Sequence, residues 1–290
     1  MNMSKTAPKV ALVTGGASGM GLGVTQALVA RGGWQVHILD VKEEEGKKVA
    51  GSLSGVHFHK VDLTKYSDLG NVIKEAFVAG GNRLDFVFAN AGIIERSSIF
   101  DTTSDSLDPP PEPNFLPMDV NLRGCINTIH IGRHYINRSP EKGSIVITGS
   151  AASVYPSFFS PIYTASKFGI LGFVRAVAGR YKVLDGIRIN ALLPGAVRTS
   201  LFEVDTWKHF PDGTLTSMDL IAKVVLGFVD GGDIVDSKGV RVPAEKNYGQ
   251  AVVASAQQYF IIPENEYCDD FTAQTMEHTR IENQAGMIKE

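Results

Sequence analysis

Tyr163 and Lys167 stand four positions apart in the sequence YTASK, residues 163–167, where a helix-like pattern begins. Residues at positions i and i+4 share one face of a helix, so the phenol and the ammonium group should be neighbours. A free tyrosine has a pKa of about 10, and a positive charge nearby stabilises the phenolate and lowers that pKa. The pair therefore predicts proton transfer with a substrate hydroxyl, Tyr163 being the general base or acid.

Ser150 ends an apolar run at residues 144–148, thirteen positions before Tyr163. Active sites of open parallel sheets lie at the carboxyl ends of strands, so Ser150 is expected to hydrogen-bond the substrate oxygen. Ser153, Ser157 and Ser160 in the following loop are alternatives. The position at a strand end favours Ser150.

The sequence TGGASGMG, residues 14–21, joins an apolar run to a helical pattern. Glycines permit a tight turn and close approach of a ligand, and the start of the helix offers free N–H groups to a phosphate. An ordinary strand–helix turn would read similarly, but the strand and helix context favours a dinucleotide pyrophosphate. The residues expected to hold it are Gly15, Ser18, Gly19, Met20 and Gly21.

Asp40 ends the second apolar run, nineteen positions after Gly21. A carboxylate there can accept hydrogen bonds from the hydroxyls of the adenosine ribose, and it would repel a 2′-phosphate. This favours NAD over NADP as the cofactor. Lys42, two residues further on, keeps NADP open as the alternative.

Apolar runs that alternate with helix-like segments must position these side chains. Several of the runs are continuously hydrophobic, which is typical of parallel strands buried on both faces. We therefore expect an α/β, doubly wound three-layer sandwich, the Rossmann fold, with a parallel sheet of about seven strands. The expected strands are 10–13, 35–39, 56–61, 84–89, 144–148, 188–193 and 251–254. The 290 residues are expected to form one dinucleotide-binding and catalytic domain.

Three segments interrupt this alternation. Residues 95–118 contain four prolines between 109 and 113, and residues 200–216 are rich in aromatic side chains. Both are expected to be irregular loops on the substrate side, because they follow strands whose carboxyl ends face the cofactor. The acid-rich tail, residues 263–290, should lie on the surface or against a partner subunit.

Composition narrows the possible partners. A net charge of −3 without a long basic run argues against nucleic acid or a membrane surface. The two cysteines, Cys125 and Cys268, are far apart and are expected to be free thiols, which suits the cytoplasm. No metal site is expected: His130 and His134 have helical ligand spacing, but a third ligand is not evident.

Taken together, these motifs resemble the short-chain dehydrogenase/reductase family of the compact, single-domain type. The similarity covers roughly residues 8 to 200, and its motifs occur in the family's order. They are TGGASGMG at 14–21, Asp62-Leu63, Asn90-Ala91-Gly92, Asn121, Ser150, YTASK at 163–167 and Pro194-Gly195. Within the family the chain is similar to the 15-hydroxyprostaglandin dehydrogenase-like branch in the sequence MGLG at 20–23 and after residue 217. It differs from that branch at 95–118, Ser160 and 200–216, which would border the substrate.

The resemblance implies further roles. Asp62 and Leu63 would contact the adenine, and Asn90, with Ala91 and Gly92, would stabilise the sheet near the cofactor. Asn121 would hold a water that links Lys167 to solvent. Finally, the strand end after residue 193 would line the nicotinamide through Pro194, Gly195, Val197 and Thr199. Lys167 would also hold the nicotinamide ribose, and Tyr163 would lie beside it.

The resulting hypothesis is an NAD-dependent oxidoreductase that interconverts a small-molecule secondary alcohol and a ketone. The alternatives are an NADP-dependent ketoreductase and a non-catalytic sensor that binds the dinucleotide. A homodimer or homotetramer is expected, because the helix from residue 163 carries apolar side chains around much of its circumference.

Overall fold

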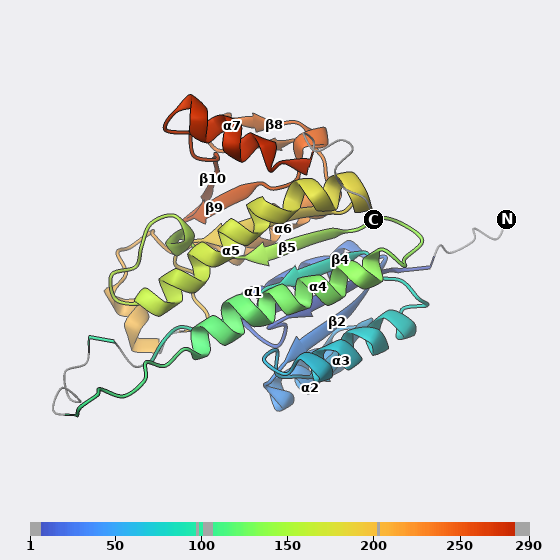
Figure 1. Cartoon of the computed structure of the whole chain (residues 1–290). Helices are drawn as coiled ribbons and strands as arrows, with labels where there is room; N and C mark the ends of the chain where they lie inside the picture. Colours follow the sequence, from blue (N-terminus) through green and yellow to red (C-terminus); the bar gives the residue numbers. More distant parts are fainter. Residues whose placement is uncertain (1–6, 97–98, 101–106, 202–203, 282–290) are drawn as a thin grey trace.

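An eight-stranded sheet forms the centre of the molecule in this computed structural model, which describes residues 7–96, 99–100, 107–201 and 204–281 (Figure 1). The strand order is β10-β9-β6-β5-β4-β1-β2-β3. The strands are β1 (Lys9–Thr14), β2 (Trp34–Asp40), β3 (Val56–Lys60), β4 (Phe86–Ala89), β5 (Ser144–Thr148), β6 (Arg188–Pro194), β9 (Ala251–Ser255) and β10 (Gln258–Ile262). A separate small hairpin pairs β7 (Ile234–Val235) with β8 (Arg241–Val242).

The seven strands expected from the sequence are all present, and each pairs in parallel with its neighbours among the seven. The eighth, β10, pairs antiparallel with β9 and forms one edge of the sheet. It follows a tight turn at Ala256, whose φ is 52°. The turn holds neither glycine nor asparagine, the residues that usually mark such a conformation, and the sequence prediction missed this hairpin.

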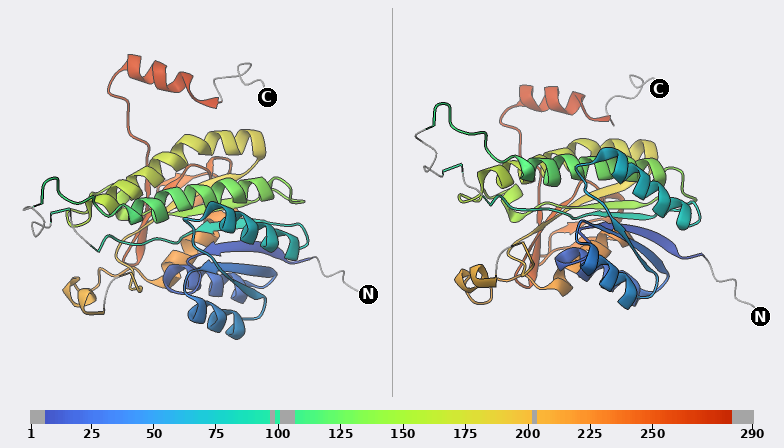
Figure 2. Two further views of the ribbon diagram at one scale, coloured as in Figure 1. Left: turned by 60° about the horizontal axis from the view of Figure 1, so that its bottom comes forward. Right: turned by 90° about the horizontal axis from the view of Figure 1, so that it is seen from below.

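Helices cover both faces of the sheet (Figure 2). One core packs α3 (Tyr66–Ala79), α4 (Cys125–Ile136) and α5 (Pro161–Arg180) on one face. The other core packs α1 (Gly19–Arg31), α2 (Glu43–Ser52) and α6 (Met218–Asp230) on the opposite face. Successive residues of β1 enter opposite cores, Val10 and Leu12 the first, Ala11 and Val13 the second. Burial on both sides explains the continuous apolar runs.

The strand order reverses direction between β1 and β4, since the chain runs from β1 outward to β3 and then from β4 outward to β10. Crossovers on the two sides of this point leave toward opposite faces, so a crevice opens at the carboxyl ends of β1 and β4. The glycine turn follows β1, and Asn90 follows β4. The topology therefore brings the two predicted motifs together.

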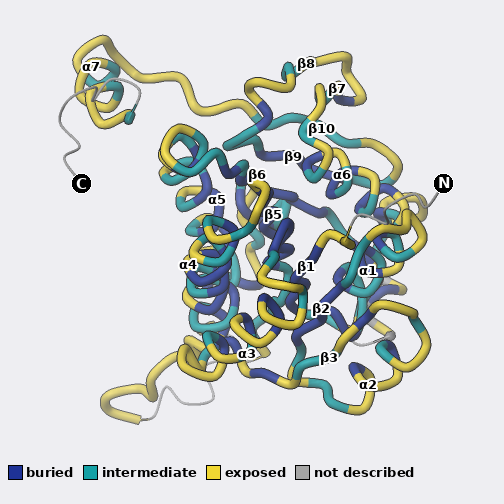
Figure 3. The backbone as a smooth tube through the Cα atoms, turned by 90° about the vertical axis from the view of Figure 1, so that its right-hand side faces the viewer, coloured by how far each residue is buried: buried dark blue, intermediate teal, exposed yellow. Residues whose placement is uncertain are grey.

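The three irregular segments are only partly described, and residues 97–98, 101–106, 202–203 and 282–290 lie outside the described residues. A π-helix, η2 (Met118–Gly124), begins at the last residue of the first segment, 95–118. A 3-10 helix, η5 (Val204–His209), lies in the second segment, 200–216. The tail forms α7 (Asp270–His278), which stands away from the sheet and carries no buried residue in the described structure (Figure 3).

Candidate active site

The glycine turn between β1 and α1 is shaped by close backbone packing. Gly15 and Gly19 have φ values of 65° and 54°, which side chains rarely adopt. A Cβ at Gly21 would lie 2.2 Å from the carbonyl oxygen of Gly15. The first turn of α1 contains no acid, and the Ser18 side chain makes no capping hydrogen bond within the described chain. The amides at this helix start thus suit an anionic group such as a pyrophosphate.

Asp40 lies beside this turn at the end of β2. Its carboxylate accepts hydrogen bonds from the Ala17 amide and the Lys42 amide, both at 3.1 Å. The Lys42 ammonium reaches across to the Ser200 hydroxyl at 3.1 Å. A negative and a positive side chain therefore flank the end of the crevice where an adenosine ribose would lie.

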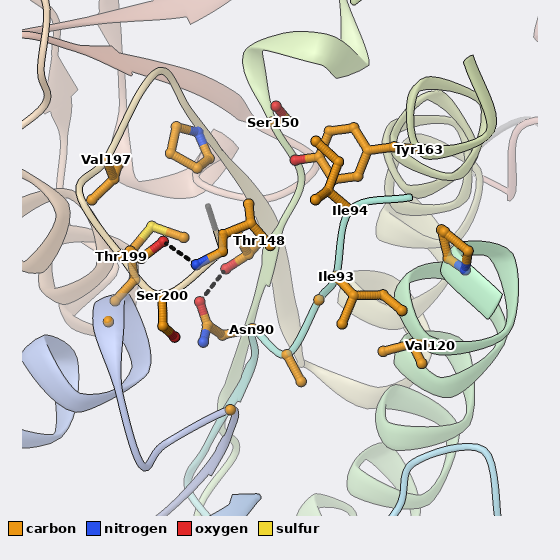
Figure 4. A pocket seen from close by; sticks show the side chains of 18 of the residues that line it. Asn90, Ile93, Ile94, Val120, Thr148, Ser150, Tyr163, Val197, Thr199 and Ser200 are labelled. Atoms are coloured by element: carbon orange, nitrogen blue, oxygen red, sulfur yellow. Dashed lines mark hydrogen bonds between the residues drawn. The ribbon is translucent and has the colours of Figure 1, made fainter. Parts of the chain in front are cut away.

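Asn90 ties three strands together beneath the turn. Its amide donates to the Thr14 carbonyl at 3.1 Å, and its side-chain oxygen accepts from the Thr148 hydroxyl at 3.1 Å (Figure 4). The Thr14 hydroxyl in turn accepts from the backbone amides of Asn90 and Ala91. The ends of β1, β4 and β5 are fixed relative to one another by these bonds.

Ser150 and Tyr163 face each other across the cavity, Ser150 at the end of β5 and Tyr163 in the first turn of α5 (Figure 4). The Ser150 hydroxyl favours the ionised form of the Tyr163 phenol and so acts to lower its pKa. Of the three alternative serines, Ser153 and Ser160 are buried, and only Ser157 reaches the cavity wall. The geometry therefore places Ser150 nearest to the phenol.

Lys167 lies one helical turn after Tyr163 and is almost completely buried. Its ammonium nitrogen donates to the Thr148 carbonyl at 2.9 Å and lies 5.5 Å from the centre of the Tyr163 ring. Burial lowers the pKa of Lys167 to about 8, while the Cys125 thiol opposes this shift. The shared helix face predicted from the i, i+4 spacing is confirmed.

The pKa of Tyr163 is raised above its ordinary value, because burial disfavours the phenolate more than the hydrogen bond with Ser150 favours it. The sequence predicted a lowered pKa for Tyr163, whereas the pKa in the described structure is raised, and Lys167 is not among the causes of the shift. The loss of water around the buried phenol is the largest cause of the shift. A group with such a pKa holds its proton at neutral pH.

Asn121 lies inside η2 and is buried. Its side-chain amide donates to the Ile93 carbonyl at 2.9 Å and to the Ser166 hydroxyl at 3.1 Å, and its oxygen accepts from the Ile93 amide at 2.8 Å. A Cβ at Gly92 would lie 3.2 Å from the Asn121 oxygen and 3.4 Å from the Lys167 nitrogen. Asn121 and Lys167 thus flank Gly92 on the same side.

A cavity of about 830 Å³ joins these features. Of the residues predicted to bind the cofactor or to take part in catalysis, Gly21 and Asn121 do not line this cavity. The others line it: Gly15, Ser18, Gly19, Met20, Asp40, Asp62, Leu63, Asn90, Ala91, Gly92, Ser150, Tyr163, Lys167, Pro194, Gly195, Val197 and Thr199. The crevice, the amides at its helix start and its acid at the ribose end together fit a nicotinamide dinucleotide.

Part of the cavity wall is apolar, and the sequence did not indicate most of the residues that form it. The apolar lining residues come from three segments: the chain after β4, η2 with the residues just before it, and the chain after β6. They are Ile93, Ile94, Leu116, Pro117, Val120, Leu201, Trp207 and Phe210. Trp207 and Phe210, from the aromatic-rich segment 200–216, line the cavity, with ring centres 5.3 Å apart. Phe158 and Phe159 are instead 82% and 87% exposed. Only tertiary structure distinguishes these pairs.

The described residues contain no group of three or more His, Cys, Asp or Glu side chains arranged to hold a metal ion. In the same part of the chain, no helix combines the length and the apolar character needed to cross a membrane. Cys125 is buried and Cys268 is exposed, and both are free thiols.

Comparison with known proteins agrees with this geometry. The short chain dehydrogenase family model matches residues 9–208. Short-chain dehydrogenase/reductase prx7 of Penicillium rubens is 39% identical over 281 residues, covering 93% of this chain and 99% of that protein. Short-chain dehydrogenase reductase 3a of Arabidopsis thaliana is 35% identical over 197 residues, covering 67% and 72%.

Solved structures share the fold. The 3-ketoacyl-(acyl-carrier-protein) reductase of Brucella melitensis, complexed with NADH, superposes with a TM-score of 0.69 at 22% identity, covering 86% of this chain and 97% of that one. With the family model spanning most of the chain, and a relative matching along nearly its whole length, the protein belongs to the short-chain dehydrogenase/reductase family.

Proposed function

We propose that this dehydrogenase/reductase uses NAD to interconvert a secondary alcohol and a ketone, with Tyr163 as the general base or acid. The observation that carries the proposal is that Ser150, Tyr163 and Lys167 line the same cavity as the glycine turn. The nicotinamide, when bound, would supply or accept the hydride at the carbinol carbon.

Each of the three side chains has a distinct task in this proposal. The Ser150 hydroxyl hydrogen-bonds the substrate oxygen beside the phenol. Tyr163 gives that oxygen a proton in ketone reduction and takes one in alcohol oxidation. The raised pKa of Tyr163 keeps the phenol protonated at neutral pH, which suits it as an acid. The Lys167 ammonium, with a pKa of about 8, is mostly charged at pH 7 and stabilises the phenolate when it forms.

The remaining site residues hold the dinucleotide in this proposal. The glycine turn would bind the pyrophosphate, Asp40 the adenosine ribose, and Asp62 with Leu63 the adenine. Asn90 supports the crevice, and Asn121 holds a water beside Lys167. The nicotinamide contacts are the strand-end residues Pro194, Gly195, Val197 and Thr199.

NADP is the alternative cofactor, favoured by one observation. Lys42 lines the cavity next to Asp40, and its ammonium could neutralise a 2′-phosphate. Asp40 favours NAD because its carboxylate would repel that phosphate at short range. A dinucleotide-binding sensor without turnover is a weaker alternative, since it would not require the set of Ser150, Tyr163, Lys167 and Asn121.

The substrate is proposed to be largely apolar, because apolar side chains of three segments form the wall beyond Tyr163. Residues 95–118 and 200–216 would serve as substrate-side loops within a single domain of 290 residues. The free thiols suit a reducing compartment such as the cytoplasm. Exposed Phe168 on α5 supports assembly as a homodimer or homotetramer.

Turnover tests the proposal directly. The purified chain is given NAD and a panel of apolar secondary alcohols, or NADH and the matching ketones, and the absorbance of the reduced nicotinamide is followed. Turnover that needs Tyr163 supports the enzyme. Tight binding of the dinucleotide without turnover of the whole panel would support the sensor instead.

A further inference from the structure

Helix α5 carries Tyr163 and Lys167, yet it begins without a cap of its own. Its N-cap residue, Ser160, makes no side-chain capping bond to the described residues, Pro161 has no amide hydrogen, and the first turn contains no acid. The amide of Tyr163 instead donates a 2.7 Å hydrogen bond to the carboxylate of Glu95. A helix start needs acceptors for its free amides, and here one comes from a segment 68 residues earlier.

The carbonyl of Tyr163 is also held. It accepts a 2.6 Å hydrogen bond from the Ser166 hydroxyl, which accepts in turn from the Asn121 amide at 3.1 Å. Asn121 bonds both backbone groups of Ile93, at 2.8 and 2.9 Å. From Ile93 the chain leads through one residue to Glu95. Hydrogen bonds and backbone together form a closed ring that fixes both peptide groups of Tyr163.

The ring lies largely out of contact with water. Asn121 and Ser166 are 1% and 0% exposed. The second carboxylate oxygen of Glu95 is buried and has no hydrogen-bond partner among the described residues. A buried polar atom in that condition costs stability, so the position of Glu95 calls for a reason beyond packing. The partial positive charge of the α5 start favours a carboxylate here.

We propose that Glu95 is a positioning residue for Tyr163. Its carboxylate oxygen fixes the first turn of α5 and so sets the place of the phenol relative to Ser150. The neighbours Ile94 and Arg96 line the substrate end of the cavity. Glu95 therefore also couples the segment that meets the substrate to the tyrosine that would exchange its proton. The inference rests on the proposed function of Tyr163.

Two substitutions separate positioning from general damage. Glu95→Ala removes the acceptor, and kcat should fall by about 10- to 100-fold, since small misplacements of reacting groups have effects of that size. KM for NAD should stay within about twofold, because the cofactor crevice is untouched. Glu95→Gln keeps an acceptor oxygen and should restore kcat to within about threefold. Glu95→Asp shortens the side chain by one methylene, and its kcat should lie between those of Glu95→Ala and Glu95→Gln. This variant replaces Glu95→Ala in the comparison if Glu95→Ala does not fold.

Ser217→Ala is the matched control. Ser217 caps α6 by accepting from the Leu220 amide at 3.2 Å, on the face of the sheet opposite α5. Losing this cap should cost about 1 kcal/mol of stability but leave kcat unchanged. An equal loss of kcat in Ser217→Ala and Glu95→Ala would overturn the proposal, as would equal loss in Glu95→Ala and Glu95→Gln.

Hydrogen exchange gives a readout that needs no turnover. In Glu95→Ala, peptides spanning residues 162–166 should exchange faster, while Glu95→Gln should match the wild type. Unchanged exchange in Glu95→Ala would show that Glu95 does not hold the Tyr163 amide and would refute the inference. If the wild type turned over no secondary alcohol, the proposed function would fall, but the exchange data would still decide whether the Glu95 contact exists.

Discussion

The ammonium nitrogen of Lys167 lies 5.5 Å from the centre of the Tyr163 ring, close enough to stabilise a phenolate. Both groups are buried, and burial moves each pKa toward the uncharged form: the Tyr163 pKa rises and the Lys167 pKa falls to about 8. Below about pH 8 the pair therefore combines a protonated phenol with a charged amine.

Tyr163→Phe should abolish turnover and leave NAD binding nearly unchanged. Removing the phenol forfeits proton transfer, an effect of about 10²- to 10⁴-fold on kcat, whereas the glycine turn and Asp40 lie elsewhere in the cavity. Turnover and calorimetric NAD binding measure the two effects separately. Lys167→Ala should weaken both. If Tyr163→Phe kept most of its kcat, Ser150 or a histidine would have to be the base.

NAD should be used in preference to NADP by roughly tenfold or more, because Asp40 would repel a 2′-phosphate. Asp40→Ala should reduce that preference. The measurement is kcat/KM with both cofactors. Lys42→Ala, which removes the nearby positive charge, is the matched substitution and should strengthen the preference for NAD. Equal or better use of NADP by the wild type would contradict the role given to Asp40.

His37 should make the fold less stable in acid. It is 1% exposed, and its Nδ1 lies 2.9 Å from Nε2 of His59. Burial, followed by the charges of His59 and His57, lowers its pKa to about 3, against 6.5 for a free side chain. Below about pH 6.5 the unfolded chain binds a proton that the folded chain refuses. The free energy of unfolding should therefore fall by up to about 1.4 kcal/mol per pH unit between pH 6.5 and 3.

Urea unfolding at pH 7 and pH 5 measures this dependence. His59, whose pKa is also lowered by burial, acts in the same direction, although Glu75 on α3 opposes it. His37→Leu should flatten the profile, and the same change at exposed His130 should not. A stability that is independent of pH over this range in the wild type would refute the assignment.

Trp207→Leu should raise KM for substrate while leaving KM for NAD unchanged. Trp207 is 7% exposed and lines the apolar end of the cavity, away from the glycine turn. Losing part of an aromatic wall typically weakens binding of an apolar group by about tenfold. Trp34→Leu is the control, because it removes an indole that packs against Phe86 in the core beneath α1, α2 and α6, outside the cavity lining. A matched change in both KM values would indicate global damage.

The protein should sediment as a dimer or tetramer at micromolar concentration. Phe168 on α5 is 44% exposed, and Val183 and Leu184 in the π-helix that follows it, η4 (Tyr181–Asp185), are 54% and 49% exposed. Phe168→Glu should shift the population toward the monomer, because a charge at an apolar contact must be desolvated. Sedimentation velocity measures the distribution. A wild type that is monomeric throughout would refute the assembly.

Much of the fold could be predicted from the sequence, because burial on both faces leaves a continuous apolar run at several of the parallel strands. The glycine turn and YTASK could also be read, since their geometry is local. The edge strand β10 was missed, because its turn at Ala256 carries no residue that marks a left-handed conformation. Likewise the π-helix around Asn121 depends on bonds to Ile93 and Ser166, 28 and 45 residues away.

The same limit applies inside the site. Glu95 stands in a proline-rich region with no periodic pattern, and its partner is 68 residues away. The raised pKa of Tyr163 could not be predicted either, because it comes from the loss of water around the phenol, which depends on the tertiary structure. Interactions between distant segments, rather than local propensity, account for both errors.

The ammonium of Lys167 is enclosed by protein, and below about pH 8 the fold has to accommodate its charge. Replacement by an uncharged side chain such as Met would relieve that penalty while removing the group that stabilises the phenolate. Variants selected only for heat resistance would thus tend to lose Lys167, whereas variants selected for turnover would retain it. At Lys167, selection for thermal stability and selection for catalytic turnover would therefore favour different side chains.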